Sequence, residues 1–239
     1  MEPKRRRPAR PAPERRLSDL AGAATRVFGR LGFKRTHVAD VAREAGVSAG
    51  LVYSYVESKE ALFHLVFVHG FGLLGEGLPP LPLATPPFSD TLAVIAAGLR
   101  ALGGTPLLRS ALDVDEPADV RAELTAIIEE RYDLYEPLWP LLGVIERSAV
   151  DLPELEDLYF TRGRRGHIAQ LDRYVERRVA GGYFRPQVDA AVTARIMTEV
   201  ITWFGWHRRE DRDASRYDDR VARAAIVAFV CDALISPAT

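Results

Sequence analysis

The first 60 residues concentrate the cationic side chains of this 239-residue chain. They contain 13 Lys or Arg against 7 Asp or Glu, a net charge of +6, whereas the remaining 179 residues carry 19 basic and 26 acidic side chains, a net charge of −7. The formal charge of the whole chain, −1, hides this asymmetry. A cationic segment of this kind suits a polyanionic partner.

Residues 1–16 hold seven of these cations and four prolines but almost no apolar side chain. A segment of this composition cannot bury enough surface to fold alone, so we expect a flexible basic arm. Its arginines could enter a minor groove of DNA, as basic arms do in other proteins. The alternative is a tail that only improves solubility.

The stretch Val38–Tyr55 has the spacing of two short helices that cross steeply at a tight turn. Ala42 supplies the small residue needed at the closest approach, and Gly46 accepts the positive φ of the turn. Thr36 and Ser48 are placed to cap the first and the second of these helices. The pattern is typical of a helix-turn-helix. The alternative is an ordinary helical hairpin, which the basic arm and the local charge disfavour.

Apolar residues recur at helical spacing through the rest of the chain, and no segment alternates like a strand, so we predict an all-α fold. The predicted domains are the arm 1–16, a three-helix DNA-binding domain 17–60 and a larger helical domain 61–239. A loop rich in proline and glycine is expected over 75–87. The expected helices cover 17–31, 38–45, 48–55, 59–74, 89–102, 106–112, 117–135, 138–150, 153–180, 188–208 and 218–235.

Residues 61–239 contain no pattern typical of a catalytic or metal site, so we expect neither an enzyme nor a cofactor. Cys231 is the only cysteine, which excludes an intrachain disulfide. No apolar run is long enough to cross a bilayer, and the arginine-rich start lacks the features of a secretory signal. These observations favour a cytoplasmic protein without a membrane partner.

Aromatic side chains give the clearest sign of a ligand site in this larger part. Pro137 and Pro140 should interrupt a helix and open a gap beside Tyr132, Tyr135 and Trp139. A late helix carries further aromatic and polar groups at helical spacing: Glu199, Trp203, Trp206 and His207. Aromatic walls with a few polar groups suit a hydrophobic or aromatic ligand, and the alternative is an ordinary helical core.

The N-terminal part resembles the DNA-binding domain of TetR-family (tetracycline-repressor-like) transcriptional regulators. The resemblance covers Leu17–Leu65 and is strongest in Phe28–Thr36, Val41–Ser48 and Val52–Leu62. The remainder resembles the helical effector-binding and dimerisation domain of that family more loosely, through four short motifs: Ile145–Glu146, Leu152–Leu155, Tyr159–Phe160 and Gly182–Arg185.

The resemblance implies that Ser48–Tyr55 is a recognition helix that lies in the major groove of double-stranded DNA. Thr36 and Ser48 would then meet phosphate oxygens at helix starts. Tyr53 and Lys59 match residues that the family directs at the DNA backbone.

Ala49 and Gly50 lie where the recognition helix would approach DNA most closely, and their small size allows backbone contact. Members of the family often carry a basic residue at the position of Ala49 and a histidine at that of Ser54 or Tyr55. Base readout would therefore fall to Ser54, Tyr55 and apolar contacts with thymine methyl groups. For Tyr55, packing in the domain's own core is the alternative.

The last two expected helices present small and apolar groups that allow close approach. The residues on the final helix are Val221, Ala222, Ala225, Ala228 and Phe229. Two such helices from each subunit would form a four-helix homodimer interface, where the resemblance also places it. The alternative is packing within one subunit.

These observations predict a ligand-responsive DNA-binding regulator. We expect a repressor that a small hydrophobic or aromatic molecule releases from a near-palindromic operator. The alternative is a helical ligand-binding or enzymatic protein with a vestigial helix-turn-helix, and only the missing basic residue at Ala49 favours it.

Overall fold

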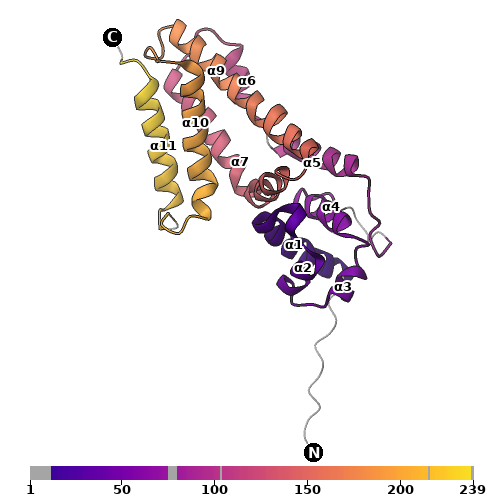
Figure 1. Cartoon of the computed structure of the whole chain (residues 1–239). Coiled ribbons are helices and arrows are strands. Elements are labelled where there is room, and N and C mark those ends of the chain that lie inside the picture. Colours follow the sequence, from indigo (N-terminus) through magenta and orange to yellow (C-terminus); the bar gives the residue numbers. More distant parts are fainter. Residues whose placement is uncertain (1–11, 75–79, 103, 215, 238–239) are drawn as a thin grey trace, which may run out of the picture. The chain divides into compact units, whose positions relative to one another are not determined.

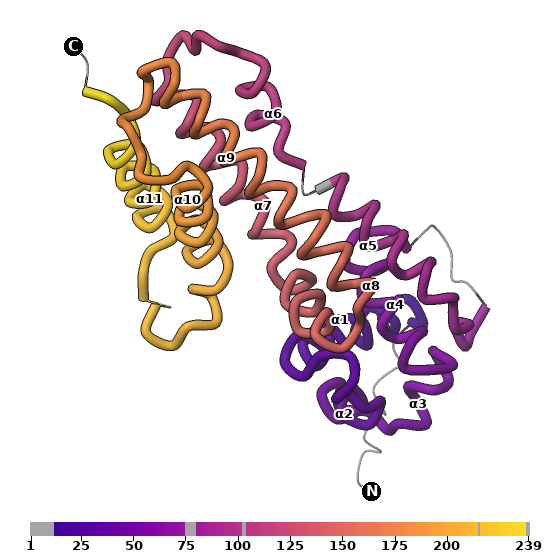
Figure 2. The backbone as a smooth tube through the Cα atoms, turned by 45° about the horizontal axis from the view of Figure 1, so that its top comes forward, coloured from indigo at the N-terminus to yellow at the C-terminus, as the bar shows by residue number. Residues whose placement is uncertain are grey.

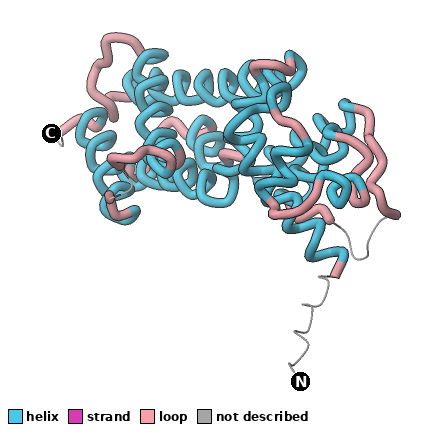
Figure 3. The backbone as a smooth tube through the Cα atoms, turned by 60° about the horizontal axis from the view of Figure 1, so that its bottom comes forward, coloured by secondary structure: helices cyan, strands magenta, loops and turns pink. Residues whose placement is uncertain are grey.

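The computed structural model describes residues 12–74, 80–102, 104–214 and 216–237. Within these ranges the chain consists of helices and loops without a strand, so the predicted all-α fold is confirmed (Figure 3). No single helix among them is long and apolar enough to cross a membrane. One pair of helices, 88–101 with 106–112, reaches that length and composition only when counted together across a bend of 64°.

The chain forms two compact units. The first unit combines residues 1–96 with 140–155, and the second combines 97–139 with 156–239. These units do not coincide with the predicted domains, whose boundary after residue 60 remains a prediction. Residues 1–11 of the predicted arm lie outside the described residues.

The helices of the first unit are α1 to α4, the first part of α5 and the last part of α7 (Figure 1). Their bounds are α1 Pro13–Arg35, α2 Val38–Glu44, α3 Ala49–Tyr53, α4 Lys59–Gly70, α5 Phe88–Leu102 and α7 Val120–Ala149. The first helix begins four residues before its predicted start at Leu17, so the last residues of the predicted arm are helical. Pro13 suits a first-turn position, where its missing N–H donor would be unpaired anyway.

Four phenylalanines form the centre of the first unit. Phe63 of α4 lies 5.1 Å from Phe28, 5.0 Å from Phe33 and 5.1 Å from Phe67 between ring centroids. All three pairs meet edge to face, the arrangement that the ring quadrupole favours. This cluster joins α1 to α4.

Gly32 interrupts α1 with a φ of 77°, directly after residue 31, where the sequence predicted the end of the first helix. A Cβ at this position would lie 2.6 Å from the backbone oxygen of Arg147 in α7, so no other residue fits without displacing backbone. The interruption turns the chain toward α2.

The helices of the second unit surround the first part of α7. They are α6 Pro106–Leu112, α9 Arg165–Ala180, α10 Ala190–Gly205 and α11 Asp219–Leu234. A π-helical segment over Asp157–Arg164 precedes α9, and a short α8 over Pro153–Glu156 begins in the first unit and ends at the first residue of the second. Hydrogen bonds tie α7 to each of α9, α10 and α11. Figures 1 and 2 both show α10 and α11 side by side.

The predicted break at Pro137 and Pro140 is wrong, because α7 runs without interruption from Val120 to Ala149. Each proline removes one backbone hydrogen bond from the helix. Leu138, Leu141 and Leu142 around them are buried, and this packing of side chains outweighs the local preference of proline.

An ion pair between Glu123 and Arg178 holds α7 against α9. The guanidinium of Arg178 is fully buried and donates to both carboxylate oxygens, at 2.8 Å in each case. It also donates to the backbone oxygens of Ala111 and Val114 at 2.9 Å, while the hydroxyl of Tyr174 donates to Glu123. Because each of the three nitrogens of this buried cation has a partner, the pair fixes the register of three segments.

We predict that Glu123→Ala lowers the free energy of unfolding by about 3–5 kcal/mol, because it leaves a buried guanidinium without its counter-charge. Urea unfolding followed by circular dichroism measures the change. The control is Asp115→Ala, which removes the surface partner of Arg177 and should cost less than about 1 kcal/mol. Equal costs for the two variants would contradict the structural role of the buried pair.

Candidate nucleic-acid interface and ligand site

The turn between α2 and α3 has the geometry of a helix-turn-helix. Gly46 adopts a φ of 66°, and the amide of Val47 donates to the backbone oxygen of Ala42 at 2.9 Å. Ser48 caps α3 as predicted, since its hydroxyl oxygen accepts a bond from the amide of Leu51 at 3.2 Å. Small residues and a positive φ thus bring the two helices together.

One edge of α3 is open to solvent. Ser48, Gly50 and Ser54 are exposed, Ala49 is half-buried, and the side chain of Tyr53 is 49% exposed. A Cβ at Gly50 would meet no atom within 4 Å, so a second molecule can approach the backbone there. The open edge therefore presents five of the eight predicted DNA-binding residues together, on a helix shorter than the predicted range 48–55.

Tyr55 points inward and is only 8% exposed. Of its two interpretations, the structure favours packing in the core over contact with a base.

Thr36 is also buried, with its hydroxyl donating to the backbone oxygen of Gly32 at 2.7 Å. The predicted N-cap at this position is wrong, because His37 caps α2 and its amide donates to the carboxylate of Asp40 at 3.0 Å. The hydroxyl of Thr36 satisfies the end of α1 instead, so it offers nothing to a phosphate.

Lys59 stands at the first position of α4, next to the capping residue Ser58. Its ammonium group donates to the backbone oxygen of Phe33 at 3.1 Å and lies 4.3 Å from the centroid of the Phe33 ring. These contacts hold a half-buried cation at a helix N-terminus, where the backbone dipole also favours an anion.

A proline-rich segment, residues 80–87, pairs with the chain between α3 and α4, and we call it the strap. The amide of Leu83 donates to the backbone oxygen of Tyr55 at 2.8 Å, and the amide of Glu57 donates to that of Leu83 at 3.0 Å. Thr85 adds a bond from its amide to the carboxylate of Glu57, at 3.0 Å, and a hydroxyl contact with Ser58 at 2.7 Å. The sequence predicted only a surface loop here.

The predicted ligand residues Tyr132, Tyr135 and Trp206 are part of a packed core. The hydroxyl of Tyr132 donates to Asp219 at 2.9 Å, and burial together with this bond raises the pKa of the phenol. Tyr135 shares a 2.7 Å hydrogen bond with Thr202 and stacks on Trp206. For these residues the alternative, an ordinary helical core, describes the structure.

The other four predicted residues do not gather around one cavity. Trp203 is 37% exposed, Trp139 is half-buried, and Glu199 pairs with the guanidinium groups of two arginines. The ring of His207 stacks on Trp206 at 4.4 Å between centroids, and burial lowers its pKa.

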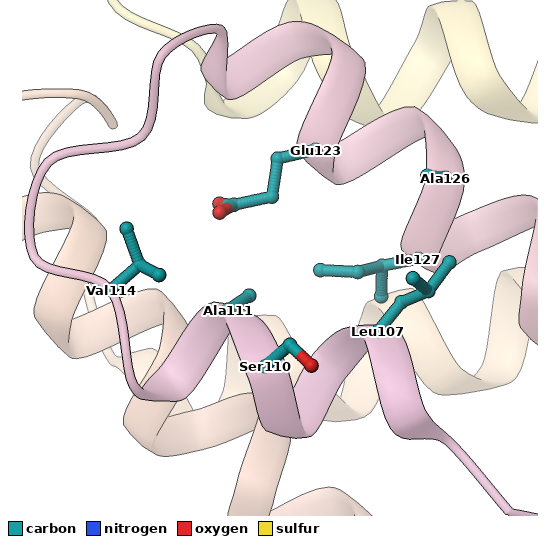
Figure 4. Close-up of a pocket in the computed structure, with 7 residues that line it drawn as sticks. All are labelled: Leu107, Ser110, Ala111, Val114, Glu123, Ala126 and Ile127. Carbon is teal, nitrogen blue, oxygen red and sulfur yellow. The ribbon is translucent and has the colours of Figure 1, made fainter.

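The described residues contain a hollow between α6 and α7 that the sequence did not predict (Figure 4). Its volume is about 200 Å³, and it is lined by Leu107, Ser110, Ala111, Val114, Glu123, Ala126 and Ile127. The walls are almost wholly apolar, and the carboxylate of Glu123 projects into the opening. No group of His, Cys, Asp or Glu among the described residues has the arrangement of a metal site.

Residues 20–66 match the sequence profile of the bacterial regulatory proteins of the tetR family. Over these residues the chain is similar to the DNA-binding domains of that family. The TetR-type domain thus contains α2, α3 and the open edge between Ser48 and Ser54.

A relative in Bacillus subtilis (strain 168), the protein YfiR, is 34% identical over 130 residues and is described as an uncharacterized HTH-type transcriptional regulator. The match covers 51% of this chain and 60% of the relative, so the chain spans less than two thirds of that protein.

Two solved structures are more distant. PfmR, a TetR-family transcriptional regulator from Thermus thermophilus, is 22% identical with a TM-score of 0.47, over 88% of this chain and 96% of that one. The reduced form of NemR from E. coli is 17% identical with a TM-score of 0.46, over 93% of this chain and 99% of that one. Likenesses of this degree say nothing about a ligand.

We predict that Leu83→Pro, which removes the amide donated to Tyr55, speeds hydrogen exchange at the amide of Glu57 by at least about tenfold, because both bonds of the strap open together. Exchange measured by NMR at residues of α4 such as Val66 should stay unchanged. Leu81→Ala is the control, since no backbone bond of the strap depends on it. Unchanged exchange at Glu57 would show that the strap is not held by these bonds.

Proposed function

We propose that this chain is a ligand-responsive, DNA-binding transcriptional regulator that acts as a dimeric repressor. In this proposal residues 1–16 are a basic arm, 17–60 form the DNA-binding domain, and 61–239 bind the effector and the second subunit. The observation that carries it is the open edge of α3 within a TetR-type domain, with Tyr53 exposed and Lys59 held by Phe33 at the start of α4.

DNA contact is supported by the chemistry of this edge. Ser48 and the backbone amides at the start of α3 suit phosphate oxygens, while Gly50 leaves room for the backbone to approach. Tyr53 offers a phenol and an aromatic face. No long cation lies on α3, so we expect base readout to depend on Ser54 and on close apolar contacts near Ala49.

A dimer is supported by two exposed apolar stripes. On α10, Val192, Ile196 and Trp203 are exposed at spacings of four and seven residues, which place them on one face. On α11, Val221 and Phe229 are 66% and 62% exposed, with Ala225 between them on the same face. Large apolar side chains left in water on adjacent helices indicate a partner, and two such pairs form a four-helix bundle.

In the proposed mechanism the dimer sets two copies of α3 about 34 Å apart, one turn of DNA, over a near-palindromic operator. An effector releases the operator if it binds more tightly to a form in which this spacing is changed. We propose a small molecule with a hydrophobic or aromatic body, because the hollow between α6 and α7 is lined almost wholly by apolar groups.

The alternative is a helical ligand-binding or enzymatic protein with a vestigial helix-turn-helix. Its supporting feature is Ala49, where a basic residue would strengthen DNA binding. The exposed phenol of Tyr53 and the positioned ammonium of Lys59 favour the regulator, because a vestigial surface has no need of either.

We predict that Tyr53→Ala weakens binding to a palindrome from the chain's own upstream DNA by at least about tenfold, since it removes a backbone contact in both half-sites. Lys59→Ala should weaken binding to all sequences alike and reduce the salt dependence by about one phosphate per subunit. Fluorescence anisotropy at several salt concentrations measures both effects.

The control for the aromatic change is Tyr217→Ala, because Tyr217 is similarly exposed, at 47%, but lies outside the DNA-binding domain. The regulator proposal fails if the unchanged protein binds the palindrome and a random duplex equally well at moderate salt.

We predict that the protein is a dimer in solution and that Ala225→Glu converts it to a monomer, because a carboxylate from each subunit cannot be placed in an apolar bundle without a partner. Light scattering at micromolar concentration measures the mass. Ala169→Glu on the exposed side of α9 adds the same charge elsewhere and should leave the dimer intact. A monomeric wild-type protein would exclude the proposed geometry.

A further inference from the structure

Four buried polar atoms of the second unit have no hydrogen-bond partner among the described residues. Two belong to neighbouring residues of α7, Oε2 of Glu130 and Nε of Arg131. The other two belong to α9, Nδ1 of His167 and Oε1 of Gln170. Buried polar atoms nearly always have partners in folded proteins, so a group of four indicates a missing hydrogen-bonding molecule.

The register of α7 and α9 brings three of these side chains together, those of Arg131, His167 and Gln170. The Glu123–Arg178 pair joins the two helices. Arg131 lies eight residues after Glu123 on α7, and Gln170 lies eight residues before Arg178 on α9. Both steps cover about 12 Å at 1.5 Å per residue. His167 lies three residues before Gln170, on the neighbouring turn of the same helix face.

Arg131 is a cation that lacks a counter-charge. Its guanidinium carbon lies 5.2 Å from the ring centroid of Tyr135, and among the described residues it makes neither an ion pair nor a hydrogen bond. Arg178, on the facing helix, has a hydrogen-bond partner for each of its three nitrogens. The contrast suggests that Arg131 is kept for a ligand, because an unpaired half-buried charge lowers the stability of the fold.

His167 is neutral next to this cation. Its side chain is 91% buried, as 9% of its surface is exposed. Burial, with a further contribution from the charge of Arg131, lowers its pKa to about 3. A neutral imidazole can donate or accept at Nδ1, so it adds a polar contact without repelling an anion or attracting a cation.

Glu130 faces a different side of α7. Its other carboxylate oxygen accepts the amide of Leu107 in α6 at 3.2 Å, and neighbouring residues on a helix project about 100° apart. Its charge therefore lies toward α6, while Arg131 lies over Tyr135. The free oxygen of Glu130 can accept a donor, such as a hydroxyl group, from the same ligand.

We propose that Arg131 binds the carboxylate of the effector, with His167 and Gln170 completing its hydrogen bonds and the hollow between α6 and α7 holding its apolar body. Leu107 links the two places, since it lines the hollow and its amide binds Glu130. Ile127 of the hollow lies one turn before Arg131 on α7. A cavity of roughly 150 Å³ accommodates a benzene ring, so a volume of about 200 Å³ suits a one-ring acid.

This inference rests on the proposed function, because it names the chemical class of the effector, and it is tested first without DNA. The probes are benzoate and 2-hydroxybenzoate, with benzyl alcohol as the neutral comparison. Benzoate at about 10 mM should raise the melting temperature of the wild-type protein by about 2–4 °C, whereas benzyl alcohol should not. The same titrations by calorimetry should show one site per subunit.

Arg131→Met should abolish the shift caused by benzoate. Without a ligand, it should keep or raise the melting temperature, since it removes an unpaired charge. The matched control is Arg121→Met on the same helix, whose guanidinium is paired with Asp232 at 2.7 Å and which should keep the benzoate shift. A second variant, Ala126→Leu, fills the hollow without touching Arg131 and should also weaken binding of benzoate by at least about tenfold.

The inference is overturned if neither acid shifts the melting temperature, if Arg131→Met retains the shift, or if this variant melts well below the wild type as a structural arginine would. Adding the operator separates this inference from the proposed function. If the protein binds the operator but neither acid has any effect, only this inference is refuted. If the acids bind through Arg131 but the protein recognises no operator, only the proposed regulator function is refuted.

Discussion

The buried pair of Glu123 and Arg178 is the contact on which the second unit depends. A guanidinium with no access to water needs hydrogen-bond partners within the protein, and here each of its nitrogens finds one, on α7, α6 or the loop that follows α6. If α9 slid by one turn, all these bonds would break together and the buried guanidinium would be left without hydrogen-bond partners. One interaction thus sets the register in which every other pair on α7 and α9 faces each other.

The first unit is organised around apolar contacts and glycine turns. The phenylalanine cluster joins α1 to α4, and Gly32 and Gly46 let the chain reverse where side chains would collide or strain the backbone. The outcome is that α3 is packed on one side only. A short helix can remain rigid in this position because its cap, its turn and its C-terminal end are each held by hydrogen bonds.

Local patterns in the sequence predicted these parts well. The spacing of apolar residues, Gly46 and the cap at Ser48 depend on neighbours within one or two turns, so periodicity and turn chemistry were sufficient. Thr36 was placed wrongly because a hydroxyl can bond forward to the next helix or back to the previous one, and spacing does not distinguish the two. The continuous α7 was missed because the burial of Leu138, Leu141 and Leu142, which depends on tertiary packing, overrode Pro137 and Pro140.

The effector residues were less predictable than the fold. Tyr132, Tyr135 and Trp206 have the composition of a ligand pocket and of a helical core alike. Only the hydrogen bonds of the two tyrosines to Asp219 and Thr202, and the stacking of Trp206 on Tyr135, identify them as core. Nothing in the sequence marks Arg131 among the many arginines of the chain. Its distinction is a buried Nε without a hydrogen-bond partner among the described residues.

The strap bears on the exchange of domains between related regulators. Residues 80–87 are separated along the chain from α3, yet two backbone bonds from Leu83 complete the segment that ends it. A chimaera joined after residue 60 or after α4 would take α3 without these bonds and would graft a recognition surface with a loosened end. A junction placed beyond Pro87 transfers the surface together with its support, so the transferable module of this protein is longer than its helix-turn-helix.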